Sequence, residues 1–184
     1  MDVKIRKLHE DARIPQYATE GAAGFDLVAC EDVIIAPGET KKVPLGLAFE
    51  IPEGYVMYVC MRSGIALKTK LRQSNGIGVI DSDYRGEVAM MFDNTAVGDN
   101  FIDYTYGLVD GNFLTDDKDC LPSIYEASYE DINVYYLIRK GDRIAQGIIA
   151  PVQRAQFVEV AELTDTARGS GGFGHSGVRA EVSE

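Results

Sequence analysis

The chain has 184 residues, of which 46% are hydrophobic, and this fits one globular domain with a substantial core and excludes a disordered protein. Its formal net charge of −11 argues against nucleic acid or an anionic membrane as a partner of the broad surface. Because no apolar stretch approaches the roughly 20 residues that cross a bilayer, and the N-terminus lacks the apolar core of a signal peptide, we expect a cytoplasmic protein.

Short strands separated by glycine- and proline-containing turns are expected over most of the chain. The first is predicted over residues 3–8, where apolar and charged residues alternate. One short helix is expected over residues 63–71, with Ser63 as its N-cap. The turns recur about every ten residues, which favours an antiparallel all-β sandwich or barrel. The further predicted strands cover residues 33–35, 42–51, 55–61, 88–92, 134–138, 144–151 and 157–160.

Residues 96–133 interrupt this strand pattern. The stretch is acidic, rich in Asp, Tyr, Gly and Asn, and only weakly periodic. A segment of this length without a clear element of its own is typical of a surface insertion. We therefore expect an insertion on the surface of the β domain.

The C-terminal segment from Arg168 to Gly177 is rich in glycine and carries one aromatic residue and two hydroxyls. Glycines let backbone N–H groups approach an anion closely, and arginine offers a fork of donors suited to phosphate. Phe173 has no local packing partner among the glycines, so it is a candidate for stacking on a flat ring. The segment predicts a flap that closes over a molecule with phosphates and a planar ring, and a disordered polar tail is the alternative.

The segment from Gly78 to Gly86 places two carboxylates and a tyrosine in one turn bounded by glycines. Asp81 follows two apolar residues and therefore lies where a strand ends. A carboxylate in that place is held rigidly and still faces water, which suits a general base. The alternative is a β-turn that uses Asp for local backbone bonds.

Three further segments carry weaker signals. The triplet 62–64 follows a strand at an expected helix start, where a phosphate oxygen or a simple cap fits. Asp26 follows a tight turn, which suits either an outer-sphere partner of Mg²⁺ or a structural aspartate. Residues 141–146 form a charged turn that leads into an apolar strand, as in an ordinary hairpin.

Taken in order, five segments resemble the motifs of the trimeric dUTPase (dUTP pyrophosphatase) family; they are residues 23–27, 62–64, 75–86, 141–146 and 168–177. The resemblance implies a jelly-roll-type β-barrel that hydrolyses dUTP to dUMP and pyrophosphate as a homotrimer. Each active site would take residues from three subunits. The barrel would comprise residues 1–95 and 134–163, and a C-terminal arm, residues 164–184, would close a neighbour's site.

The resemblance also implies roles for the residues of the third motif. Asp81 would be the base that activates the water attacking the α-phosphorus. Asn75 and the backbone near Ala89 would bind the edge of uracil, and cytosine would leave buried polar groups unpaired at about 1–3 kcal/mol each. Tyr84 would lie against the deoxyribose and exclude a 2′-hydroxyl. The hairpin residues assigned to the substrate with them are Gly78, Val79 and Ile80.

The other motifs would hold the phosphates. Arg168 would bind the γ-phosphate, and Phe173 would stack on uracil. Mg²⁺ would bridge the phosphates, with Asp26 reaching it through water, and metal and arginines together would neutralise the leaving pyrophosphate. The remaining phosphate-binding residues implied by the resemblance are Arg62, Ser63, Gly64, Gln146, Gly174 and Ser176.

Two departures from the family pattern stand out. Met61 replaces the proline that usually precedes the Arg-Ser-Gly triplet. The insertion at residues 96–133 resembles those of some phage dUTPases, where it has been linked to contacts with a regulatory protein. Its tyrosines would form a partner surface or bind the insertion to its own barrel; they are Tyr104, Tyr106, Tyr125 and Tyr129.

Two alternative functions remain open at this point. The sister family of dCTP deaminases, some of them bifunctional, shares the barrel and some of the motifs. The protein could also be chiefly an interaction module whose insertion binds a partner.

Overall fold

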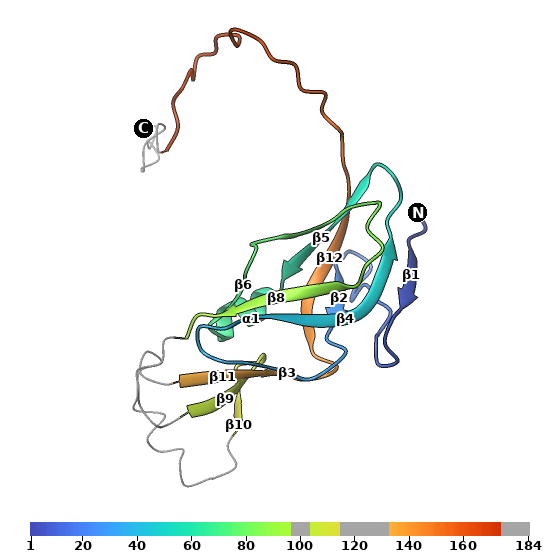
Figure 1. Cartoon of the computed structure of the whole chain (residues 1–184), viewed down its shortest axis with the longest axis vertical. Helices are drawn as coiled ribbons and strands as arrows, with labels where there is room; N and C mark the ends of the chain where they lie inside the picture. Colours follow the sequence, from blue (N-terminus) through green and yellow to red (C-terminus); the bar gives the residue numbers. More distant parts are fainter. Residues whose placement is uncertain (97–103, 115–132, 174–184) are drawn as a thin grey trace, which may run out of the picture. The chain divides into compact units, whose positions relative to one another are not determined.

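The computed structural model describes residues 1–96, 104–114 and 133–173, and the chain forms strands and one short helix in these ranges (Figure 1). The helix is α1 (Ser63–Lys68). The strands are β1 (Lys4–Lys7), β2 (Phe25–Val28), β3 (Val33–Ile35), β4 (Thr40–Glu50), β5 (Tyr55–Met61), β6 (Leu71–Gln73), β7 (Gly78–Ile80), β8 (Val88–Asn94), β9 (Tyr104–Leu108), β10 (Phe113–Leu114), β11 (Asn133–Ile138) and β12 (Arg143–Pro151).

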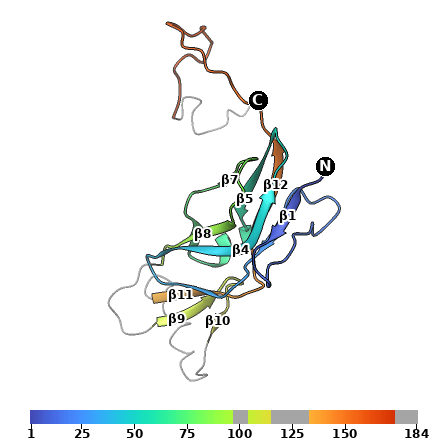
Figure 2. The same ribbon diagram turned by 45° about the vertical axis from the view of Figure 1, so that its right-hand side comes forward.

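The strands form three four-stranded sheets, with orders β1-β4-β8-β6, β2-β12-β5-β7 and β10-β9-β11-β3. Figure 2 shows β5, β7 and β12 of the second sheet beside one another. The all-β prediction with one short helix is confirmed, and the sheets are of the jelly-roll type. In the described ranges they remain three separate sheets and do not close into a single barrel.

Some strands were predicted correctly from the sequence pattern, and others were not. The predictions at residues 33–35 and 55–61 match β3 and β5. The strand predicted over residues 157–160 is wrong, because these residues form no strand and the Phe157 side chain is 94% exposed. An apolar stretch becomes a strand only where a neighbouring strand satisfies its backbone groups. The short strands β2 and β6 were not predicted, whereas the strand end expected directly before Asp81 is the end of β7.

The helix begins at the expected place but is shorter and capped differently. Arg62, not Ser63, is the N-cap, and no side chain makes the capping hydrogen bond. The helix ends at Lys68 because Thr69 is extended, and both the N–H and the hydroxyl of Thr69 donate to the carbonyl of Ile65. Ser63 is therefore the first helical residue, and its hydroxyl is not used for capping.

A buried polar side chain joins three strands inside the apolar core. Asn94, at the end of β8, is only 2% exposed. Its Nδ2 donates to the carbonyls of Ile35 on β3 (3.0 Å) and Val134 on β11 (2.7 Å), and its Oδ1 accepts from the N–H of Ala96 (3.0 Å). Both the nitrogen and the oxygen of the Asn94 amide are thus paired, as a buried amide requires. The largest fully buried apolar side chains around this core include Phe49, Phe92, Leu27, Leu45, Met57 and Ile144.

A bulge at Gly46 lets β4 serve two neighbours. The register of β4 against β8 shifts between Pro44 and Leu47, and from Leu47 onward β4 also pairs with β1. Gly46 has φ +64°, and a Cβ there would lie 2.8 Å from the Cβ of His9, so only glycine fits. The N–H of Gly46 donates to Glu87 Oε1 (3.1 Å). Because Glu87 directly precedes β8, this bond joins the bulge to the start of that strand.

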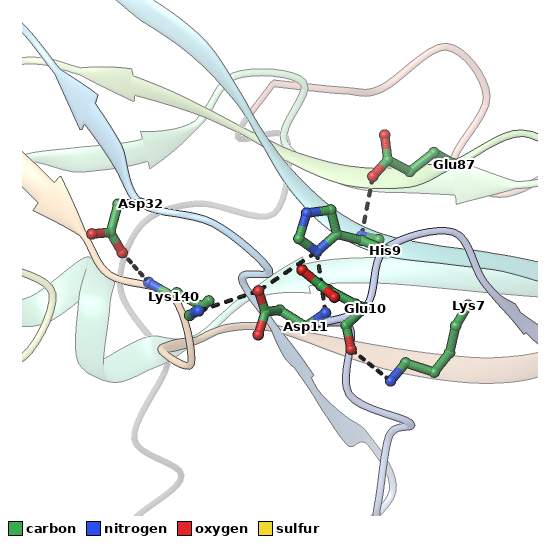
Figure 3. A network of polar contacts seen from close by, with 8 residues as sticks. Lys7, His9, Glu10, Asp11, Asp32, Glu87 and Lys140 are labelled. Carbon is green, nitrogen blue, oxygen red and sulfur yellow. Dashed lines mark hydrogen bonds and ion pairs between the residues drawn. The ribbon is translucent and has the colours of Figure 1, made fainter.

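Charged groups hold the segment after β1 against the turn between β11 and β12 (Figure 3). Lys140 donates its backbone N–H to Asp32 Oδ1 (2.6 Å), and its Nζ lies 3.2 Å from Asp11 Oδ2. The N–H of Asp11 donates to His9 Nδ1 (3.2 Å). Two loops far apart in sequence are therefore joined through one lysine.

The predicted insertion contributes two strands to a sheet of the domain. Strand β9 pairs in parallel with β11, from Tyr104 opposite Asn133 to Leu108 opposite Leu137, and β10 pairs with β9. The backbone pairing holds this part of the insertion against the β domain. The side chains of Tyr104 and Tyr106, and all of Tyr125 and Tyr129, lie outside the described residues.

The chain separates into two compact units, residues 1–153 and 154–184. In the second unit, the described residues 154–173 contain turns but no helix or strand. None of the helices in the described ranges is long and apolar enough to cross a membrane.

Candidate functional site

A pocket of about 260 Å³ opens beside the hairpin that follows β6. Strand β7 pairs with β5 and contributes residues 78–80 to the lining, and β8 contributes Val88, Ala89 and Met91. The structure thus brings together seven residues that the sequence assigned to the substrate: Asn75, Gly78, Val79, Ile80, Asp81, Tyr84 and Ala89. The lining also includes residues that the sequence did not assign: Lys42, Val59, Gln73, Glu87, Val88 and Met91.

Asp81 lies directly after β7 and is exposed at this pocket. Its carbonyl accepts from the N–H of Tyr84 (3.2 Å), so the backbone of the turn is fixed. Its carboxylate makes no hydrogen bond or ion pair with any residue in the described part of the chain. The backbone at Asp81 is therefore fixed, and the carboxylate is exposed at the pocket with no partner in the described part of the chain.

Tyr84 is packed over the following glycine. Its hydroxyl donates to the carbonyl of Glu87 (3.0 Å). A Cβ at Gly86 would lie 2.3 Å from that hydroxyl oxygen, so the residue must be glycine for the ring to lie there. Arg85 further stiffens the turn by donating to the carbonyls of Ser82 (2.7 Å) and Tyr84 (2.9 Å).

The start of the hairpin is fixed by an aspartate on the neighbouring strand. Ser74 and Thr40 both donate their hydroxyls to Asp93 Oδ1, each at 2.6 Å. These hydrogen bonds, chiefly that from Ser74, lower the pKa of the Asp93 carboxyl below its ordinary value of 3.8. The turn that carries Asn75 is therefore anchored on β8 next to the pocket.

A second group of predicted residues gathers around Asp26 on β2. Asp26 is mostly buried, with 13% of its side chain exposed. Its Oδ2 accepts from Arg143 (3.1 Å), and its Oδ1 lies 3.3 Å from Arg62 Nε without hydrogen-bond geometry. Gln146 pairs with Asp26 across the β2–β12 ladder. The result is a carboxylate between two guanidinium groups, close to the first turn of α1 with Ser63 and Gly64.

Arg143 was not assigned a role from the sequence. Its position inside the fourth motif segment, residues 141–146, is the sequence feature that could have indicated a role at the site. The residues of this second group do not line the pocket that holds Asn75 and Asp81. The described part of the chain holds no group of three or more His, Cys, Asp or Glu residues that could bind a metal.

The residues assigned to the arm belong to the second compact unit. Arg168 Nε donates to the carbonyl of Gly171 (2.8 Å), and Gly169 donates to Thr166, so a turn forms locally. Phe173 has φ +45° and a fully exposed ring, at 115% of the reference area. Gly174 and Ser176 lie outside the described residues.

Comparison with known proteins decides the family. The family model described as dUTPase matches residues 10–104 and 117–177. The chain belongs to the dUTPase family. The deoxyuridine 5'-triphosphate nucleotidohydrolase of Nautilia profundicola is 42% identical over 177 residues, which is 96% of this chain and 99% of that protein. That of Helicobacter pylori is 36% identical over 178 residues, covering 97% and 98%.

Solved dUTPase structures share the fold. The dUTPase of Staphylococcus bacteriophage 80alpha with dUpNHpp aligns with a TM-score of 0.83 at 30% identity, over 96% of this chain and 99% of that one. The dUTPase of phage phi11 of S. aureus, whose species-specific insert was visualised, aligns with a TM-score of 0.74 at 29% identity, over 90% and 100%. The resemblance inferred from the motifs is therefore confirmed at the level of family and fold.

Proposed function

We propose that this member of the dUTPase family hydrolyses dUTP to dUMP and pyrophosphate by attack of water on the α-phosphorus. The observation that carries the proposal is the Asp81 carboxylate, which is exposed at the pocket and unpaired in the described part of the chain. A base must be free to bind the attacking water, and the Asp81 carboxylate meets this condition on a turn whose backbone is fixed.

The same pocket suits the deoxyuridine part of the substrate. Asn75 and the backbone near Ala89 would bind the edge of uracil. The Tyr84 ring, held by its bond to the Glu87 carbonyl, would leave no space for a 2′-hydroxyl. The pocket would select the base through hydrogen bonds and the sugar through its shape.

The residues around Asp26 fit a metal held mainly by the substrate. Asp26 Oδ1 is buried and has no hydrogen-bond partner, which leaves an acceptor for a metal-bound water. A single carboxylate beside Arg62 and Arg143 would not hold Mg²⁺ alone, so phosphate oxygens would supply most of its ligands. When bound, Mg²⁺ would neutralise charge on the phosphates and the leaving pyrophosphate. Arg62, Ser63, Gly64 and Gln146 would orient the phosphate chain.

The separation of these two groups supports a shared site in a homotrimer. The phosphate-binding candidates do not line the pocket that holds Asp81. The second unit also exposes apolar side chains that its own described residues leave uncovered, including Phe157, Val158 and Leu163. A neighbouring subunit would cover them, and the arm would bring Arg168, Phe173, Gly174 and Ser176 to the nucleotide.

Product analysis tests the function. The full-length protein is incubated with dUTP, UTP or dCTP, with and without magnesium, and nucleotide, pyrophosphate and ammonia are measured. We expect dUMP and pyrophosphate from dUTP alone, in a magnesium-dependent reaction. Ammonia from dCTP would instead indicate the deaminase activity of the sister family, and no turnover of any nucleotide would refute the proposal.

The insertion supports a second role as a protein-binding element. The 80alpha and phi11 structures that align here come from phage dUTPases, and 80alpha phage dUTPases are described as controlling the transfer of virulence genes. We infer that residues 96–133 contact a regulatory protein. Because β9 and β10 belong to a sheet of the domain, the test replaces residues 115–132 by a short Gly-Ser linker and keeps both strands. Retained dUTP hydrolysis with loss of a captured partner would support the role, and loss of hydrolysis would show that this segment is part of the enzyme.

A further inference from the structure

Gln73 joins two sheets next to the pocket. It is the last residue of β6, in the β1-β4-β8-β6 sheet, and its side chain reaches the backbone of β5 in the β2-β12-β5-β7 sheet. The pairing of β5 with β7 ends where Val59 lies opposite Gly78. The Gln73 amide binds the backbone groups of β5 just beyond that end.

The backbone of β5 fixes which way the Gln73 amide points. Its Oε1 accepts from the N–H of Met61 (2.9 Å), and its Nε2 donates to the carbonyl of Val59 (2.9 Å). A backbone N–H can only donate and a backbone carbonyl can only accept. Turning the amide over would set donor against donor and acceptor against acceptor, so one orientation is imposed.

The second N–H of the same amide reaches Asn75. Gln73 Nε2 also donates to Asn75 Oδ1, at 3.3 Å. An amide nitrogen has two hydrogens, and this one uses both, on Val59 and Asn75. Because Gln73 offers Asn75 a donor, Asn75 must turn its oxygen toward Gln73, and its own Nδ2 becomes the group left for the pocket.

We propose that Gln73 is a positioning residue that sets base specificity by holding the Asn75 amide with its nitrogen toward the base. This rests on the proposed function, in which Asn75 binds the edge of uracil. The 4-position of uracil carries an oxygen that accepts a hydrogen bond, and cytosine carries an amino group that donates one. An Asn75 that presents N–H groups favours uracil, and one turned over would present Oδ1 and favour cytosine.

Two substitutions separate this role from a purely structural one. Gln73→Met keeps the length of the side chain but removes all three hydrogen bonds, so Asn75 is free to take either orientation. Gln73→Glu still accepts from Met61, but it loses the bond to the Val59 carbonyl and offers Asn75 an acceptor in place of a donor. Asn75 must then turn its nitrogen toward residue 73 and present its oxygen to the base.

The matched control is Ser74→Ala. It removes the hydrogen bond to Asp93 from the same turn and leaves the partner of the Asn75 amide unchanged. Any loss of specificity that comes only from loosening the hairpin should appear in this control as well.

The measurement compares dUTP turnover with inhibition by dCTP. For each variant, kcat and KM for dUTP and the inhibition constant of dCTP are determined with the full-length protein. In Gln73→Met we expect the preference for dUTP over dCTP to fall about tenfold or more, through KM with kcat largely kept. In Gln73→Glu we expect a larger fall, with dCTP binding more tightly than to the wild type, and in Ser74→Ala an unchanged preference.

The outcomes are distinguishable from a failure of the proposed function. A wild-type protein that does not hydrolyse dUTP would refute the function itself. An active wild type whose Gln73→Glu variant still rejects dCTP would overturn the role of Gln73 alone, as would equal losses of preference in Gln73→Glu and Ser74→Ala. If Gln73→Met does not fold, Gln73→Glu, which keeps the bond to Met61, carries the test, with the orientation of the Asn75 amide followed by its side-chain NMR signals.

Discussion

The hairpin at residues 75–89 and the C-terminal arm carry the predicted functional residues in opposite ways. In the hairpin, hydrogen bonds from β6, β8 and the turn itself fix Asn75, Tyr84 and the backbone of Asp81. In the arm, the described residues make only a local turn, and the ring of Phe173 is fully exposed. The hairpin is fixed before the substrate binds, whereas the described residues of the arm have no partners outside their own turn.

This difference indicates that the hairpin and the arm have different roles in binding the nucleotide. Groups that choose the base or orient water gain from being held rigidly, because no order has to be created on binding. Groups that cover the phosphates must first let the nucleotide enter, and a segment with few contacts permits this. The hairpin and the arm can be altered separately by substitution and by truncation.

The largest effect is expected at Asp81. Asp81→Asn removes the base but keeps the size of the side chain and the fixed backbone, so turnover should fall by about 10²–10⁴-fold while nucleotide binding is kept. Pyrophosphate release measures turnover, and the affinity for a non-hydrolysable dUTP analogue measures nucleotide binding. Asp83→Asn, at the neighbouring exposed carboxylate, should keep most of the activity. Equal activity in the two variants would disprove the assignment of the base.

Removing the arm tests the other region. Deletion of residues 167–184 takes away Arg168 and Phe173 and should lower turnover by about 10²-fold, since charged donors to the developing phosphate charge are lost. Size-exclusion chromatography with light scattering should show an unchanged assembly, because the β domain holds its own core. Full turnover in the truncated protein would show that the arm is only a polar tail.

A smaller effect, on stability and not on specificity, is expected in the core behind the hairpin. Asn94→Ala removes three buried side-chain hydrogen bonds, to the carbonyls of Ile35 and Val134 and from the N–H of Ala96, and should lower the free energy of unfolding by about 3 kcal/mol. Denaturant unfolding at one fixed protein concentration measures it, with the exposed Asn112→Ala as control. A change in the preference for dUTP over dCTP would show that the core and the hairpin are not independent.

The smallest effect concerns the anchor of the hairpin on β8. Because the pKa of Asp93 is lowered in the folded protein, its contribution is present above its ordinary pKa of 3.8 and is lost as the pH falls through the lower, folded value. Asp93→Asn should therefore reduce the melting temperature slightly at neutral pH and flatten its dependence on pH between about 5 and about 3. Melting curves across this range would contradict the expectation if both proteins lost stability in parallel.

The sequence allowed the motif residues of the pocket to be predicted, because they lie together in one short segment. Asp81 could be placed at a strand end from the two apolar residues before it. The strand predicted at residues 157–160 is absent, because the apolar pattern of a segment does not show whether a neighbouring strand pairs with it. The cap of α1 was assigned to Ser63 on residue type, whereas the N-cap is Arg62, one residue earlier.

Gln73 shows most clearly what only the folded chain decides. It lies just outside the third motif, two residues before Asn75, and its partners on β5 lie 12 and 14 residues away. The sequence by itself determined the family, the all-β class and the chemical types of the site residues, because these depend on local pattern and motif order. The tertiary structure decided which amide hydrogen meets which oxygen, since hydrogen bonds are directional and depend on strands brought together only by folding.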